Sequence, residues 1–335
     1  MSAAIKRRDV SPPAPSAPPP PNRLLLASVF GATLVVASVL LFVRVPTTTI
    51  ELSGVLSGVG FVATQEQPLN RPLRVSAVGI AGVKDAQLPE EIPALGRGAS
   101  AVRIATDSAG SIVVDRIVVP AGTQVWVSRT DLPRQYRISL RSTAAAPIKV
   151  HADVMGNVEF APANARPTTV ALRAPRPVDI TGSDGTLDLD VTLAPGAAVP
   201  RWQQLVVRDV RVHRVEDEHD AARPLARPVS TVLSGSIFFE SLGGTERKLR
   251  AGETLRFGAA TGTILTFDLR EDGIAATFQG VVREMRTSAW DHPRSLMPTL
   301  LDWLRRRQGL SLLWGTAIYI YGMGVALRRW WRKPE

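Results

Sequence analysis

The hydrophobic pattern divides the chain into two uncharged runs with a long alternating region between them. Residues 24–43 form one run and residues 310–327 form the other, and neither contains a charged side chain. A helix rises about 1.5 Å per residue, so about 20 such residues cover the roughly 30 Å hydrocarbon core of a bilayer. We therefore expect two transmembrane helices, one in each run.

The first run is interpreted as an uncleaved anchor. The apolar core of a cleavable signal peptide is roughly 7–15 residues long, which is shorter than this run. Arg44, Val45 and Pro46 follow it without the small-x-small spacing of a cleavage site. We expect residues 24–43 to remain in the mature chain.

Between the two runs, short apolar stretches alternate with turn residues. Leu187, Leu189 and Val191 take every second position, with Asp188 and Asp190 between them. This period is typical of a half-buried strand, and turn signals about every 8–12 residues favour an antiparallel sandwich. We predict an all-β extracytoplasmic region, flanked by two transmembrane α-helices. It spans residues 44–290, with two lobes at 44–214 and 228–290 as one arrangement.

A faint internal repeat accompanies this pattern. Residues 110–115 are similar to residues 235–240, and residues 120–127 are similar to residues 250–257. A duplicated β-module would explain the similarity, and so would the turn chemistry that β-hairpins share. The repeat therefore leaves open whether the region is one domain or a duplicated pair.

An amphipathic segment precedes the second run. We expect an interfacial helix over residues 293–308, because Leu296, Leu300, Trp303 and Leu304 fall on one helical face. Tryptophans beyond the second run mark the far interface. The residues expected to anchor the chain at the membrane surface are Leu300, Trp303, Leu304, Trp330 and Trp331.

Small residues recur at four-residue spacing in both uncharged runs. This spacing lets membrane helices approach each other closely. The positions expected to pack helices are Ala27, Gly31, Thr33, Ala37, Gly322 and Ala326. Neither run contains an ionisable side chain, which counts against a transporter.

The charge of the chain is concentrated in its two tails. Of the net charge of +10, the Pro-rich, disordered tail 1–23 and the basic tail 328–335 each carry four basic residues against one acid. Basic residues beside membrane segments favour the cytoplasmic side, so we expect both termini there and residues 44–309 in the periplasm. A composition rich in Ala, Arg and Pro without cysteine suits a bacterial inner-membrane protein.

The residues offer little for catalysis. The absence of cysteine removes disulfides and thiolate chemistry, and the four histidines have no metal-ligand spacing. The acidic run 216–220 has oxygen ligands for a divalent cation, but such a run is more typical of a solvated loop. We expect no catalytic residue, no metal and no cofactor.

Two tryptophans are candidates for ligand contact. Trp126 lies on a predicted strand and Trp202 just before one. On an exposed sheet they would stack on sugar rings, and in the interior they would be ordinary core residues. Both interpretations stay open at this point.

The combined features favour a non-enzymatic inner-membrane protein. It would present a β-sandwich in the periplasm as a scaffold or ligand-binding accessory of a cell-envelope complex, with glycan as the favoured ligand. One alternative is a subunit of an oligomeric pore gated by the β-region, and another is a hydrolase that uses the acidic run or the loop at Asp184. Expected partners are the lipid bilayer, further copies of the chain and other envelope membrane proteins, but not nucleic acid.

Overall fold

The computed structural model describes the β-region almost completely. The described residues are 23–69, 72–92, 100–143, 146–163, 166–197, 199, 201–215, 228–288, 293–306, 311, 314, 315, 317–319, 321, 322 and 325. The predicted tails lie outside these residues, apart from Arg23. The acidic run 216–220 also lies outside them.

Strands dominate the described chain, which confirms the all-β prediction for the region between the helices. The first half contains β1 (Thr48–Leu56), β2 (Gly58–Ala63), β3 (Gln67–Leu69), β4 (Leu73–Ala81), β5 (Val83–Gln87), β6 (Ala101–Thr106), β7 (Ser111–Val119), β8 (Gln124–Arg129), β9 (Gln135–Arg141), β10 (Lys149–Pro162) and β11 (Thr168–Gly182). The second half contains β12 (Thr186–Leu193), β13 (Arg201–Arg211), β14 (His213–Val215), β15 (Pro228–Ser230), β16 (Val232–Phe239), the 3-10 helix η1 (Glu240–Leu242), β17 (Thr245–Leu249), β18 (Thr254–Phe257), β19 (Ala260–Arg270), β20 (Gly273–Val282), β21 (Met285–Ser288) and β22 (Pro293–Ser295).

One antiparallel sheet runs through most of these strands. Its strands pair in the order β17–β16–β1–β20–β19–β13–β2–β8–β9–β12–β4. Beyond β4, strands β6 and β7 lie end to end between β4 and β10, and β11 and β5 follow. Two small sheets, β14–β15 and β18–β21–β22, complete the region.

Two strand bends close this sheet into two units. β1 continues into β2 at Ser57. Three strands close the ring between them: β20 pairs with β1, β19 with β20, and β13 with both β19 and β2. β4 continues into β5 at Gly82, whose φ of 79° suits glycine, and β6–β7, β10 and β11 pair in turn between them. We call the first ring, with β16–β18, β21 and β22, the proximal unit. The second ring, with β8, β9 and β12, is the distal unit.

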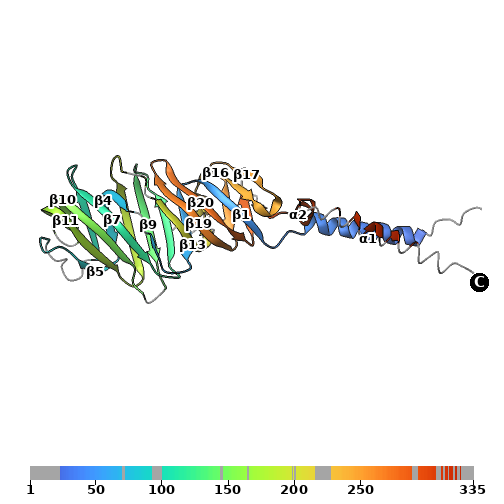
Figure 1. Cartoon of the computed structure of the whole chain (residues 1–335), viewed down its shortest axis with the longest axis horizontal. Helices are drawn as coiled ribbons and strands as arrows, with labels where there is room; N and C mark the ends of the chain where they lie inside the picture. Colours follow the sequence, from blue (N-terminus) through green and yellow to red (C-terminus); the bar gives the residue numbers. More distant parts are fainter. Residues whose placement is uncertain are drawn as a thin grey trace, which may run out of the picture.

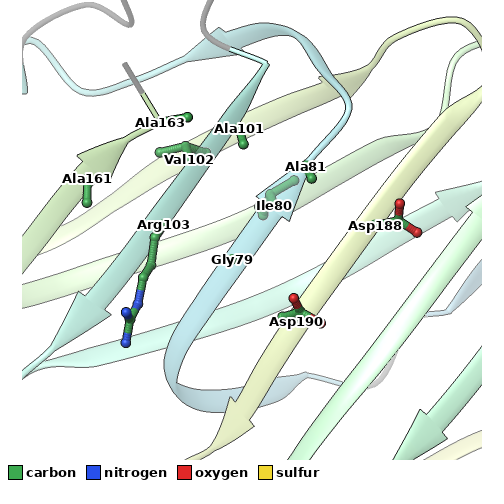
Figure 2. Close-up of a pocket in the computed structure, with 10 residues that line it drawn as sticks. All are labelled: Gly79, Ile80, Ala81, Ala101, Val102, Arg103, Ala161, Ala163, Asp188 and Asp190. Atoms are coloured by element: carbon green, nitrogen blue, oxygen red, sulfur yellow. The ribbon is translucent and has the colours of Figure 1, made fainter. Parts of the chain in front are cut away.

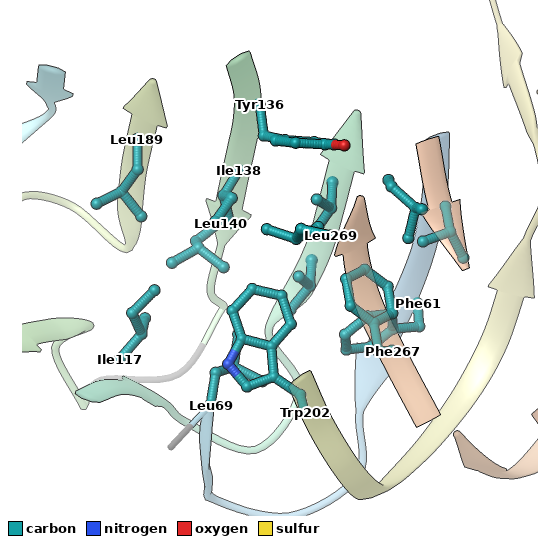
Figure 3. Packing of buried hydrophobic residues seen from close by; sticks show 14 of the residues in the cluster. Phe61, Leu69, Ile117, Tyr136, Ile138, Leu140, Leu189, Trp202, Phe267 and Leu269 are labelled. Atoms are coloured by element: carbon teal, nitrogen blue, oxygen red, sulfur yellow. The ribbon is translucent and has the colours of Figure 1, made fainter. Parts of the chain in front are cut away.

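The core of the two units is continuous at their junction (Figure 3). Trp202 is 1% exposed, and its ring lies 5.2 Å from that of Phe267, which meets Phe61 edge-on at 6.4 Å. Tyr136 of the distal unit donates its hydroxyl proton toward the carbonyls of Arg270 and Gly273, between β19 and β20. The side chain of Tyr136 therefore ties the distal unit to the proximal one.

The helices lie together at one end of the molecule (Figure 1). α1 (Arg23–Phe42) confirms a helix over nearly all of the predicted run 24–43, and α2 (Leu300–Arg306) contacts it. The segments leaving the helices pair: Leu300 N donates to Val43 O at 2.9 Å, and Val45 N donates to Pro298 O at 3.0 Å. Figure 1 shows the proximal unit next to the helices and the distal unit farther away.

The second helical region differs from the prediction. The expected helix 293–308 is in fact strand β22 followed by the shorter α2, because Pro293–Ser295 pairs with β21. Thr299 begins α2 by accepting a hydrogen bond from Asp302 N, while its own hydroxyl donates to the Asp302 carboxylate at 2.7 Å. Within the predicted run 310–327, the described positions are helical.

Membrane crossing is a separate question from helix formation. In the part of the chain that the structure describes, we find no helix with the combined length and apolar character that crossing a membrane requires. The two transmembrane helices therefore stay predictions.

The strand pairing also bears on the two-lobe arrangement. β1, from the start of the predicted lobe 44–214, pairs on one side with β16 and on the other with β20, both from the predicted lobe 228–290. A unit built from residues 228–290 alone would lack its central strand. The repeat segments also pair differently, since β8 pairs with β9 whereas β18 pairs with β21.

Candidate ligand-binding face

The outer face of the sheet carries two adjacent rows of residues across the junction into the distal unit. Residues directly opposite each other on paired strands point to the same face, so the register defines each row. We call the two rows, together with Arg141 next to Ser139 on the same face of β9, the outer band. The first row is Arg211, Gly60, Trp126, Ser139, Asp188, Ala81 and Ala101. The second row is Gly58, Ser128, Arg137, Asp190, Gly79, Arg103 and Ala161.

Trp126 lies at one end of the outer band, against two glycines. A Cβ added to Gly60 would lie only 2.4 Å from Cε3 of Trp126, and one added to Gly58 would lie 3.1 Å from Cζ2. The half-buried indole therefore rests against the bare backbone of β2, and a side chain at Gly60 would displace it. Next to it is a hollow of about 90 Å³, lined among others by Arg141, Asp209 and Arg211.

Two ion pairs form the middle of the band. Arg137 binds Asp190 with two hydrogen bonds, from Nε at 2.7 Å and from Nη2 at 3.3 Å. Arg141 Nη2 lies 2.8 Å from Asp188 Oδ2. Burial opposes ionisation of Asp188, but hydrogen bonds from Arg141 and Ser139 outweigh it and lower the pKa of this carboxyl. The hydrogen bond and charge of Asp190 raise the pKa of Arg137. Asp188 and Arg137 are therefore held in their charged forms.

A second hollow of about 270 Å³ lies on the other side of these ion pairs (Figure 2). Asp188 and Asp190 of β12 line one side of it, and Arg103 of β6 also lines it. Ile80 and Val102 also line it, but their side chains are buried in the core, and the other lining residues are small: Gly79, Ala81, Ala101, Ala161 and Ala163. The hollow therefore combines a floor without large side chains with two carboxylates and a guanidinium.

This arrangement is suited to binding and poorly suited to acid–base chemistry. A general acid needs a raised pKa, whereas Asp188 is held ionised by its partners. Within the described ranges, no three acidic or histidine side chains come together as metal ligands. The band instead offers an aromatic ring, carboxylate acceptors and guanidinium donors over a shallow surface.

The two candidate tryptophans lie in different environments, one in the core and one on the outer face. Of the two interpretations of Trp202, the core one holds and the stacking candidate is excluded, because this side chain is buried in the junction core. Trp126 lies on the outer band, where its role in ligand stacking stays a prediction. The alternation along the sequence places Asp188 and Asp190 on an outward face. Arg137 and Arg141 were not predicted as site residues, although they alternate in the same way with Tyr136, Ile138 and Leu140.

The predicted membrane residues are only partly described. Leu300 and Leu304 are half-buried on α2, and Trp303 packs partly against the core. A Cβ added at Gly31 or Gly322 would meet nothing within 4 Å in the described chain, so no packing partner is seen for them there. Ala37 is exposed. The side chains of Ala27, Thr33, Ala326, Trp330 and Trp331 lie outside the described residues.

A second charged surface surrounds the start of the helices. One hollow of about 420 Å³ is lined by Arg44, Arg283, Glu284 and Arg286 among others. Another, of about 460 Å³, is lined by Gly243, Asp302, Arg305 and Arg306. We call these charged residues, together with the exposed Arg294, the basic base. Its six arginines and two acids give the same net charge, +4, as the whole chain between the two basic tails.

Comparison with protein-family models, with curated proteins and with solved structures finds no match to this chain in any of the three.

Proposed function

We propose that the protein is a non-enzymatic protein of the bacterial inner membrane that presents its β-region in the periplasm. In this proposal α1 and the helical segment after α2 both cross the membrane, and both termini are cytoplasmic. The β-region serves as a scaffold or ligand-binding accessory of a cell-envelope complex.

The observation that carries this proposal is the pairing of the two segments that leave the helices. Backbone hydrogen bonds join Val43 to Leu300 and Val45 to Pro298, and Arg44 Nη1 donates to Met297 O at 2.5 Å. The helical segments therefore enter the β-region at one point. Two neighbouring anchors would hold the β-region in few orientations, which suits a component of an assembly better than a freely moving binder.

The basic base supports a position of the β-region close to a membrane, while the choice of side rests on the basic N-terminal tail. Arginines next to a membrane segment are attracted to anionic lipid headgroups, by about 1 kcal/mol for each residue close to the surface. Arg305 and Arg306 end α2, and Arg283 and Arg294 are exposed nearby without an ion pair to any described acid. A surface facing phospholipid headgroups would have this composition.

A binding role is favoured over hydrolysis by the paired charges of the outer band. Hydrolysis of a glycosidic bond commonly needs one protonated and one ionised carboxyl. Asp188 and Asp190 are both engaged by arginines. This pairing instead preorganises donors and acceptors for hydrogen bonding to a ligand.

The test is cross-linking of the full-length protein in its native membrane, followed by purification in detergent. We expect specific envelope membrane proteins or further copies of the chain in the cross-linked product. A lone monomer that carries no partner would contradict the proposal. Steady conductance of the purified protein in planar bilayers would contradict it as well and would support the pore alternative.

A further inference from the structure

We propose that the outer band binds a linear glycan chain that lies across the strands, with one sugar ring stacked on Trp126. Sugars farther along the chain would lie over the ion pairs and in the hollow beside Asp188 and Asp190. This inference rests on the proposed function in that it names the ligand of the ligand-binding accessory.

The dimensions of the band suit a chain of several sugars. From Trp126 on β8 to Ala101 on β6, the first row crosses four strand-to-strand steps. Neighbouring strands lie about 4.8 Å apart, so this part of the row is about 19 Å long. The two hollows, of about 90 and 270 Å³, lie along it on either side of the ion pairs. A single small molecule would occupy only one of them.

The chemistry of the band matches a polyhydroxylated ligand. The half-buried indole of Trp126 lies against Gly58 and Gly60, and its exposed part offers an apolar aromatic surface to a sugar ring. The carboxylates of Asp188 and Asp190 accept hydrogen bonds from hydroxyl groups. The guanidiniums of Arg137 and Arg141 donate to hydroxyl and ring oxygens while they hold those carboxylates in place.

Other ligand classes fit the same surface less well. The two aspartates would repel a polyphosphate or nucleic acid, and the charges of Arg137 and Arg141 are already paired, which leaves Arg103 as the one arginine among the described residues that line the larger hollow. A lipid tail would have to cover four charged side chains, at a large desolvation cost. An added peptide strand needs a free sheet edge, whereas β9, β12 and β4 are paired on both sides.

The experiment measures glycan binding by the full-length protein in detergent. The probes are two linear neutral hexasaccharides, one of β-linked glucose and one of β-linked N-acetylglucosamine. Each is compared with its monosaccharide, and binding is measured by isothermal titration calorimetry. We expect at least one hexasaccharide to bind, and to bind at least tenfold more tightly than its monosaccharide. Trp126→Ala should weaken this binding at least tenfold, and Asp190→Asn should weaken it severalfold.

Two further variants separate the band from the rest of the surface. Phe238→Ala removes another exposed aromatic side chain, on β16 of the proximal unit, and should leave the affinity unchanged. Gly60→Ala keeps the indole but displaces it, and should weaken binding nearly as much as Trp126→Ala.

The proposal is overturned if wild type binds neither hexasaccharide, or if Trp126→Ala binds as tightly as wild type. In either case, the Trp126→Ala variant is also cross-linked in its native membrane. If it still cross-links to its partners, the glycan inference has failed and the proposed function stands. If wild type itself cross-links to no partner, the proposed function has failed.

Discussion

The basic base and the outer band both carry several arginines, but the two regions use them differently. In the outer band, Arg137 and Arg141 are each paired with an aspartate on the neighbouring strand. At the basic base, Arg305 and Arg306 form no ion pair within the described chain, although Asp302 lines the same hollow. The two ion pairs of the band are thus balanced within the chain, whereas the charges of Arg305 and Arg306 are available to something outside it.

This difference indicates two kinds of contact at two places along the molecule. Unpaired arginines beside the helices suit a broad anionic surface, which needs charge but little shape. Paired charges around a half-buried indole suit a neutral polar ligand, which needs fixed donors and acceptors. The junction core lies between the two regions and joins them in one continuous core.

Trp202→Ala is expected to have the largest effect. It removes a buried aromatic side chain from the junction core, where it contacts Phe267. Such truncations cost about 3–5 kcal/mol of unfolding free energy. Denaturant unfolding of the purified protein measures the loss, with Trp126→Ala as the matched control because that side chain lies on the outer face. Equal destabilisation by the two variants would remove the distinction between core and band.

The double variant Arg305→Gln/Arg306→Gln should weaken binding of anionic phospholipid by about 2 kcal/mol, at about 1 kcal/mol for each arginine. The measurement is native mass spectrometry of the protein titrated with phosphatidylglycerol. Arg137→Gln/Arg141→Gln removes the same charge from the outer band and should not change lipid binding. Similar losses in both double variants would contradict the separate roles of base and band.

Tyr136→Phe should destabilise the fold by about 1–2 kcal/mol, because the Arg270 and Gly273 carbonyls lose their donor. Burial raises the pKa of Tyr136 to about 12 from its ordinary value of 10. As the pH rises, the unfolded chain therefore loses the phenolic proton first. The stabilisation is complete below pH 10 and is lost between pH 10 and about 12.

Unfolding titrations of wild type and Tyr136→Phe at pH 8, 10 and 11.5 check this pH dependence. The difference in unfolding free energy between the two proteins should shrink as the pH rises. A constant difference at all three values would mean that the Tyr136 hydroxyl is not held by the junction.

Asp190→Asn should have the smallest effect on stability. It weakens an ion pair in which Arg137 and Asp190 are both well exposed, and such pairs contribute about 0.2–1 kcal/mol. Thermal unfolding at low and high salt measures the change, which salt should reduce. A loss above about 2 kcal/mol would show that the outer band is part of the structural core.

Some of this architecture was predictable from the sequence, and the reason lies in strand periodicity. In β12, Leu187, Leu189 and Val191 are fully buried, as the alternation predicted. The outward direction of Asp188 and Asp190 follows from the same alternation. Their arginine partners lie on β9, 47 and 53 residues earlier in the chain, and only the strand register reveals that pairing.

The face of Trp202 could not be predicted in this way. β13 has positive φ angles at Gln204 (57°) and Asp209 (53°), and its burial pattern shows two consecutive exposed residues at each of these places. A strand with such irregularities changes the face to which its later residues point. A period of two therefore does not carry from one end of β13 to the other, and the inward position of Trp202 had no local signal.

The central claim is that the paired helices hold the β-region on the periplasmic side of a membrane. The chain contains no cysteine, so single-cysteine variants give labelling without background. Intact spheroplasts that express Ser108→Cys, Ser2→Cys or Glu335→Cys are treated with a membrane-impermeant maleimide. The account predicts labelling of Ser108→Cys, in the exposed turn between β6 and β7, and labelling of the other two only after permeabilisation. Labelling of Ser2→Cys or Glu335→Cys in intact spheroplasts, with Ser108→Cys protected, would contradict it.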